Sequence, residues 1–266
     1  RRVHCGRGAN MAQPELTFLN ARKPKVLVAL LLTFASGIVD ITGFLGIFHL
    51  FTAHLTGDTV HLGSDLSAHE WSSALATSLI VLAFASGALF GRIALEIGSR
   101  RGIRRIASIT IATELILLLC VAIPSTADSL SGYGKIVCLA AAMGTQTATL
   151  TRIGPLTVHT TFVTGMVNKI TQLVSHIVFR TYDLARASSD AERVGLRAQR
   201  TLETEMALFL ACVWSFFVGG AAFGTWTFGF WGMRALFTSI AILLFALLID
   251  VVWPLSIEEE KEQSER

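Results

Sequence analysis

The chain has 266 residues, of which 52% are hydrophobic and only 15% are charged. In soluble domains, roughly a quarter of all residues are charged. The composition therefore excludes an ordinary soluble domain and indicates an integral membrane protein. The net charge of +3 is small, and the basic residues lie beside apolar stretches. We therefore expect a lipid bilayer around the chain and no nucleic acid partner.

Six apolar windows are each long enough, or nearly so, for the ~20 residues that a spanning helix needs. They cover residues 26–48, 72–98, 103–123, 135–151, 204–227 and 231–253. Residues 1–25 are expected to form a cytoplasmic leader, in which Met11 looks like the true start of the chain. Residues 254–266 are expected to form an acidic cytoplasmic tail.

Two parts of the chain carry glycines and a Thr-Gly pair in the same order, which predicts an internal repeat of residues 26–123 and 124–253. Each copy has a glycine in its first apolar window, then a Thr-Gly pair, then two glycines spaced four apart. The matching residues are Gly37 with Gly144, Thr56-Gly57 with Thr164-Gly165, Gly87 with Gly220, and Gly91 with Gly224.

Basic residues decide how many stretches cross the membrane. If the polar stretches 51–66 and 157–178 also spanned, the basic cluster at 98–105 would face outward, against the positive-inside rule. If both stretches re-enter instead, six spans remain, and the N-terminus, the loops 98–105 and 180–203 and the C-terminal tail are all cytoplasmic. Three crossings per half then require the second half to be inverted.

The predicted fold class is therefore all-α, with six transmembrane helices and two re-entrant segments in an inverted three-plus-three repeat. Non-helical backbone at membrane depth is tolerated only where protein or a water-filled cavity satisfies its polar groups, so two opposed re-entrant segments predict a polar cavity. The Thr-Gly pairs suit the tips of these segments. The alternative is that they are only tight helix contacts.

Titratable residues gather in the first copy. Asp40 lies within a spanning window, where a carboxylate costs ~2.5–3.5 kcal/mol. It is expected either to act in coupling or binding, or to make a structural hydrogen bond. His54 and Asp58 would share a helix face, which makes a proton relay conceivable. His61 could complete a zinc site with them, but the site is predicted to hold neither metal nor cofactor.

The second copy carries hydroxyl, amide and one basic group rather than acids. Gln146 is expected near the level of Asp40, and Asn168 and Lys169 follow the second Thr-Gly pair. Lys169 could balance Asp40, attract an anion, or extend to the cytoplasmic surface. Glu114 is a second carboxylate within a spanning window, with no evident partner.

The four glycines Gly87, Gly91, Gly220 and Gly224 form small-xxx-small motifs. Such motifs mediate close helix packing, either within the chain or between subunits of a homo-oligomer. No hydrolase, metalloprotease, phosphate-loop or dinucleotide motif is present, so we do not expect an enzyme.

The stretches ASGIVDITGF, LFTAHLTGDTVHLG, MGTQTATL and TTFVTGMVNKI resemble the YoaK-like family of bacterial inner-membrane proteins of unknown function. The resemblance covers roughly residues 25–255 and implies a multi-pass inner-membrane protein of about six helices. Members of that family tend to carry Asn at the position of Asp58, and Gln-Asn where this chain has Gln146-Thr147. The resemblance supplies no substrate.

These observations predict a secondary transporter, or less strongly a channel, for a small polar or anionic solute. The predicted pathway is lined by Asp40, His54, Thr56, Gly57, Asp58, Gln146, Thr164, Gly165, Asn168 and Lys169. The alternative is a non-transporting membrane scaffold or regulatory partner that acts through the segment 180–203 and the glycine faces.

Overall fold

The computed structural model describes residues 23–103, 105–123, 126, 129–149, 152–153, 156–157 and 163–254. Most of the predicted leader, with Met11, and residues 255–266 of the predicted tail lie outside this part. The described chain is almost entirely helical, as predicted. Its elements are α1 (Lys23–Gly46), α2 (Leu55–Ala68), α3 (Trp71–Arg100), α4 (Ile106–Ala122), α6 (Gly132–Thr149), β1 (Arg152–Ile153), β2 (Leu156–Thr157), α7 (Val163–Arg186), α8 (Asp190–Trp231), η1 (Gly232–Ala235) and α9 (Leu236–Val252).

Several helices have the length and apolar composition of membrane spans. Within the described residues, three helical stretches meet both requirements: α1, α3 and the unbroken stretch Asp190–Val252, which holds α8, η1 and α9. The helix α4 is apolar but shorter. Large apolar side chains remain exposed on the bundle, among them Leu82, Ile116 and Leu248. A surface of this kind indicates a membrane protein, because lipid covers apolar side chains that water would not.

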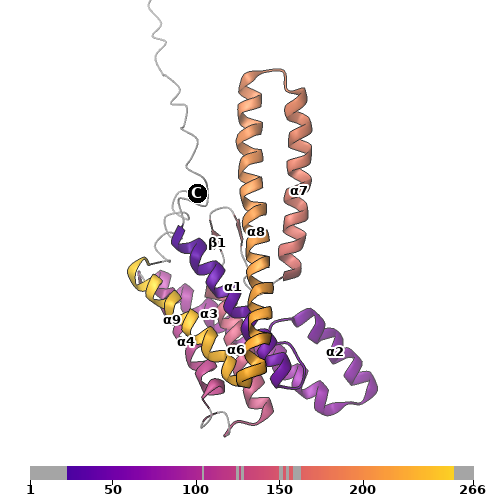
Figure 1. Ribbon diagram of the computed structural model, residues 1–266, viewed down its shortest axis with the longest axis vertical. Coiled ribbons are helices and arrows are strands. Elements are labelled where there is room, and N and C mark those ends of the chain that lie inside the picture. Colours follow the sequence, from indigo (N-terminus) through magenta and orange to yellow (C-terminus); the bar gives the residue numbers. More distant parts are fainter. Residues whose placement is uncertain are drawn as a thin grey trace, which may run out of the picture.

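Four helices form the centre of the bundle. Each packs against the next in a closed ring, α1 on α9, α9 on α4, α4 on α6 and α6 on α1, while α3 packs outside α6 and α8 packs outside α1 (Figure 1). The core of this ring is apolar and includes Leu32, Ile111, Met143 and Leu243, all fully buried. We refer to α1, α4, α6 and α9 as the central ring.

Contacts between helix ends give the directions of the helices. Phe48, just after α1, packs on Tyr133 at the start of α6 with ring centroids 5.0 Å apart. The Tyr133 hydroxyl donates to the backbone oxygen of Ser72 at the start of α3. At the opposite end of the bundle, Ser108 near the start of α4 donates to Asp250 near the end of α9. Therefore α1 and α4 run one way, and α3, α6 and α9 run the other way.

Glycines allow α1 and α8 to approach closely. A Cβ atom on Gly37 would lie 2.3 Å from the backbone oxygen of Phe217, and one on Gly220 would lie 2.1 Å from that of Phe34. One further turn along, a Cβ atom on Gly224 would lie 2.6 Å from the Ile41 side chain. No side chain fits at these separations, and the order of the contacts shows that α1 and α8 run parallel.

The contact of α3 with α6 has the same form. A Cβ atom on Gly87 or on Gly144 would lie 2.1 Å from a backbone oxygen, that of Ala141 or Phe84 respectively. A Cβ atom on Gly91 would lie 2.6 Å from the Ala148 side chain. Backbone therefore packs on backbone in this pair of parallel helices as well.

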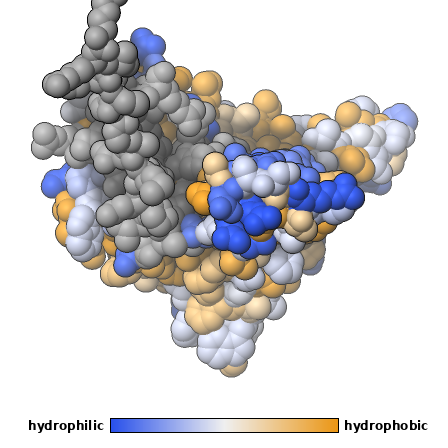
Figure 2. Space-filling view, turned by 90° about the horizontal axis from the view of Figure 1, so that it is seen from above, coloured by the Kyte–Doolittle hydropathy of each residue, from blue (hydrophilic) through white to orange (hydrophobic). Residues whose placement is uncertain are grey.

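The helix α7 and the first half of α8 form an antiparallel hairpin that projects beyond the central ring (Figure 1). The segment 180–203 lies at the end of this hairpin and is almost wholly helical. Seen from this end, strongly hydrophilic residues gather over the hairpin, whereas apolar residues cover much of the surrounding surface (Figure 2). The polar hairpin and the apolar bundle therefore suit different environments.

Candidate functional site

The chain after α1 turns back and returns along the helix it has just left. Phe48 and His49 both adopt a left-handed backbone conformation, with φ of 55° in each case. Residues other than glycine seldom adopt this conformation, and two in succession reverse the chain sharply. Residues 52–54 consequently lie beside Asp40, about 9 Å back from the end of α1 at a rise of 1.5 Å per residue.

Asp40 anchors this returning loop. Its Oδ1 atom accepts hydrogen bonds from the Thr52 backbone N–H at 2.7 Å, the Thr52 hydroxyl at 3.0 Å and the Ala53 backbone N–H at 3.2 Å. Its other oxygen, Oδ2, lies 2.7 Å from Nδ1 of His54. The carboxylate is only 3% exposed, so these four contacts replace the water that burial removes.

His54 connects the loop to α8. Its ring lies between Phe51, with centroids 4.7 Å apart, and Phe217 of α8, with centroids 6.2 Å apart. The hydrogen bond to Asp40, together with the charges of Asp40 and Asp58, raises the pKa of His54 against the opposing effect of burial. The imidazole is half-buried, so it contacts the buried Asp40 carboxylate and is also partly exposed at the protein surface.

Asp58 is the third member of this cluster. It lies in the first turn of α2, a helix of 14 residues that is too short to span a bilayer. The residue is 2% exposed, and its Oδ2 atom has no hydrogen-bond partner among the described residues. Burial, followed by the nearby charge of Asp40, raises the pKa of Asp58 to about 6. Asp40, His54 and Asp58 together form what we call the acidic cluster.

The first Thr-Gly pair opens α2 next to the acidic cluster. Thr56 and Gly57 are both exposed, and a Cβ atom on Gly57 would meet nothing within 4 Å. His61 is also exposed on α2, one turn after Asp58, and its charge opposes the rise in the pKa of that carboxyl group. Within the described ranges, no group of three or more His, Cys, Asp or Glu residues is arranged to hold a metal ion.

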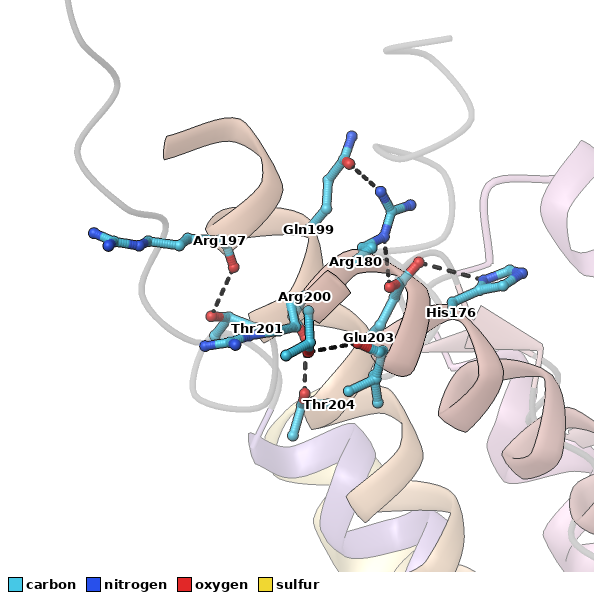
Figure 3. A network of polar contacts seen from close by, with 10 residues as sticks. His176, Arg180, Arg197, Gln199, Arg200, Thr201, Glu203 and Thr204 are labelled. Carbon is cyan, nitrogen blue, oxygen red and sulfur yellow. Dashed lines mark hydrogen bonds and ion pairs between the residues drawn. The ribbon is translucent and has the colours of Figure 1, made fainter. Parts of the chain in front are cut away.

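The second Thr-Gly pair, Thr164 and Gly165, lies in the first turn of α7. The register of α7 on α8 is given by Glu203, which contacts Arg180 at 2.7 Å and His176 at 3.4 Å (Figure 3). Because the two helices are antiparallel, each step back along α7 from this contact matches a step forward along α8. The start of α7 therefore lies opposite the turn of α8 that holds Phe217. That turn also faces His54, so α2 and α7 begin at a similar depth.

The other predicted pathway residues lie apart from the acidic cluster. Asn168 and Lys169 are exposed on α7. Gln146 is fully buried in α6, where its side-chain N–H donates to the Leu32 backbone oxygen at 2.6 Å. Leu32 precedes Asp40 by about 12 Å along α1. Gln146 therefore does not lie at the level of Asp40, as the sequence predicted, but about 12 Å from it along the helix axis.

A second polar network joins the two helices of the projecting hairpin, beyond the middle of α7. Arg180 donates from Nε to Glu203 and from Nη1 to Gln199, and His176 contacts the other oxygen of Glu203 (Figure 3). The hydrogen bond to Glu203 raises the pKa of Arg180 further above its ordinary value. The sequence does not single out these residues, because charged residues on a polar helix carry no signal that separates a network from a solvated surface.

The contribution of Thr52 and Ala53 was also missed. Their backbone N–H groups bind Asp40, and a backbone donor leaves no trace in the sequence. The only available signal was Asp40 itself, because a carboxylate within a spanning helix requires donors from elsewhere in the chain.

Helices of this length and composition indicate a membrane protein of the all-α class. Residues 28–249 match the family described as "Protein of unknown function (DUF1275)", and the chain belongs to this family. No curated protein and no solved structure matches the chain. The match confirms the prediction of a family of unknown function, while the YoaK-like resemblance itself stays a prediction.

Proposed function

We propose that the chain crosses the bacterial inner membrane six times, through α1, α3, α4, α6, the second half of α8, and α9, as an inverted repeat with both termini in the cytoplasm. The packing scheme supports this proposal. In the proposed repeat, α1 corresponds to α6, α3 to α8, and α4 to α9. Exchanging each helix for its counterpart converts the contact of α1 with α8 into that of α6 with α3. The same exchange converts the contact of α1 with α9 into that of α6 with α4.

The helix ends support the topology as well. Arg100 ends α3, and Arg101 and Arg105 follow it, at the end of the bundle where Ser108 meets Asp250. The hairpin of α7 and α8 projects from this same end (Figure 1). An excess of Lys and Arg marks the cytoplasmic side of a membrane protein, so this end would lie in the cytoplasm.

Within this frame, the protein is a secondary transporter for a small polar solute. The observation that carries the proposal is the return of residues 52–54 to Asp40, which brings irregular backbone and the acidic cluster to the inside of an apolar bundle. Irregular backbone at membrane depth lines binding sites in transporters built from inverted repeats. The start of α7 would approach the same region from the opposite side.

The chemistry of the acidic cluster limits the classes of solute that the site would bind. Asp40 and Asp58 contribute two carboxyl groups and His54 one imidazole, so the site favours a neutral or cationic polar solute over an anion. A proton is a natural coupling ion, because the pKa of Asp58, at about 6, allows this group to load and release a proton near neutral pH.

Transport is tested by reconstituting the protein in liposomes and recording currents on a solid-supported membrane. A panel of small polar solutes is applied with and without a pH gradient. We expect a current with at least one solute, and we expect Asp40→Asn to abolish its dependence on the gradient. Glu96→Gln is the matched control, because Glu96 is exposed and pairs with Arg100 far from the cluster. An unchanged pH dependence in Asp40→Asn would contradict proton coupling through Asp40.

The topology is tested separately by thiol labelling of intact cells. Cys5, Cys120, Cys138 and Cys212 are removed, and single cysteines replace His49 or Ser67, the two ends of the first polar segment. Labelling of both positions from outside is the expected result. Labelling of Ser67→Cys only from inside would mean that the segment spans, and the inverted arrangement would be wrong.

A membrane scaffold or regulatory partner is the second candidate function, and the projecting hairpin favours it. Within the segment 180–203, the hairpin exposes the apolar side chains of Tyr182, Val194 and Leu202, as a partner-binding surface would. The glycine faces do not serve this role, since Gly87 and Gly220 already pack within the chain. Replacing residues 180–203 with a short linker separates the two functions: a scaffold loses its partner, whereas a transporter keeps its flux.

A further inference from the structure

We propose that the central ring contains a binding site for a small monovalent metal cation such as Na⁺, formed by Glu114 of α4 and Gln146 of α6. This site is separate from the acidic cluster. Its existence does not depend on the transport proposal, because cation binding is measurable in a protein that transports nothing.

Glu114 is the most isolated acidic group in the described part of the chain. It is fully buried, and neither of its carboxyl oxygens has a hydrogen-bond partner among the described residues. Its neighbours one turn away on the buried face of α4 are Thr110, Ile111 and Leu118. The Thr110 hydroxyl donates to the Ala107 backbone oxygen rather than to Glu114. An ionised carboxyl group in such surroundings is very costly unless a positive charge lies against it.

Gln146 also has an oxygen without a partner. Its Nε2 atom donates to the Leu32 backbone oxygen, which fixes the orientation of the amide. The Oε1 atom is buried and accepts no hydrogen bond from the described residues. Native structures seldom leave such atoms unsatisfied, so three of them on two neighbouring helices call for a common explanation.

The helix registers bring Glu114 and Gln146 to the same level. Cys120 of α4 and Cys138 of α6 lie close enough to interact electrostatically. Because α4 and α6 are antiparallel, this register puts Glu114 opposite Gly144, within one turn of Gln146.

The contacts of α4 with α9 and of α9 with α1 also place Glu114 at the level of Gln146. The hydrogen bond of Ser108 to Asp250 sets α4 against α9 and places Glu114 beside Leu243. The bond of Ser239 to the Ala35 backbone oxygen, at 3.4 Å, sets α9 against α1. Leu243 then lies at the level of Leu32, the residue that Gln146 contacts.

The atoms define the class of ligand. Two carboxyl oxygens and one amide oxygen are hard acceptors, which suit Na⁺ and similar cations and not soft metals. A single carboxylate balances one positive charge, which favours a monovalent over a divalent ion. A proton on Glu114 would satisfy at most two of the three oxygens, whereas a cation between the helices meets all three.

The test measures binding of radioactive ²²Na⁺ to the purified full-length protein in detergent, with choline chloride holding the ionic strength constant. We expect saturable binding that weakens at least tenfold in Glu114→Gln and also weakens in Gln146→Ala. Glu96→Gln, the same change at an exposed position, should bind as the unmodified protein does. Absence of saturable binding to the unmodified protein, or equal binding by Glu114→Gln, would overturn the proposal.

A second measurement needs no variant and covers the case in which the substitutions prevent folding. Dicyclohexylcarbodiimide modifies carboxyl groups in apolar surroundings, and mass spectrometry of the peptide containing Glu114 reports the extent of modification. Protection of Glu114 by Na⁺ but not by choline supports the cation site. Modification that responds to pH and not to Na⁺ would show a proton site only and would overturn the proposal.

Discussion

The two junctions lead into helices that begin with a Thr-Gly pair, but they differ in backbone and in chemistry. At the first, between α1 and α2, Asp40 holds the returning loop through backbone and side-chain donors. At the second, between α6 and α7, the short strands β1 and β2 bury Ile153 and Leu156, and Gln146 binds one backbone oxygen. Both halves have helices that pack closely at glycines, whereas the acidic cluster lies in the first half alone.

This difference indicates a division of roles within one architecture. Close contacts of α1 with α8 and of α3 with α6 join the two halves into one scaffold, and the acidic cluster occurs once, where one loop returns to one carboxylate. Variants at matched positions therefore either affect both halves alike, if they act on the scaffold, or affect the first half alone, if they act on the cluster.

The largest expected effect is on the shared scaffold. Gly37→Leu and Gly144→Leu should each destabilise the protein by about 3 kcal/mol or more, because each side chain would meet backbone of the facing helix. Thermal unfolding of the purified variants in detergent measures the loss. Gly57→Ala is the control: nothing lies near its Cβ position, and alanine favours a helix by up to about 1 kcal/mol. A Gly144→Leu variant as stable as the parent would show that the halves pack differently.

The next effect is specific to the first junction. Asp40→Ala should cost roughly 2–4 kcal/mol, because the Thr52 and Ala53 donors would lose their acceptor inside the protein. Gln146→Ala removes a single hydrogen bond and should cost about 1–2 kcal/mol. Asp40→Asn keeps an acceptor oxygen and should lie between the parent and Asp40→Ala. Chemical denaturation in detergent ranks the three variants, and an equal cost for Asp40→Ala and Gln146→Ala would remove the distinction between the junctions.

The scaffold was more predictable than the cluster. Apolar windows located α1, α3 and α9 within a few residues, and repeated glycines pointed to the positions where backbone meets backbone. The helix α8 was not foreseen at its full length of 42 residues, because its charged first half differs in composition from its apolar second half. Composition reports the environment of a helix and does not report where the helix ends.

At the acidic cluster, the sequence indicated which groups matter but not how they meet. Asp40, His54 and Asp58 were visible as titratable residues in an apolar chain. The loop that brings them together depends on left-handed conformations at Phe48 and His49, neither of which is a glycine. Tertiary contacts stabilise these conformations, and a single sequence contains no local signal for them.

The smallest expected effect is a pH dependence that only the first junction can produce. The pKa of Asp58 is raised from 3.8 to about 6 in the folded protein, so folding favours the protonated carboxyl group. The stability contributed by Asp58 is therefore lost as pH rises from about 4 through 6. The raised pKa of His54 has the same sign, because stability from its protonated ring is lost as pH rises above 6.5.

Asp58→Asn isolates the contribution of Asp58. The difference in melting temperature between parent and variant, followed from pH 4 to pH 8 in detergent, should change by a few degrees between about pH 4 and 6 and stay level above that range. Thr59→Ala, at an exposed position of the same helix, is the control and should show a flat difference, because neither side chain titrates. A flat difference for Asp58→Asn as well would mean that this carboxyl group titrates as it does in the unfolded chain, and the acidic cluster would then be reduced to the pair of Asp40 and His54.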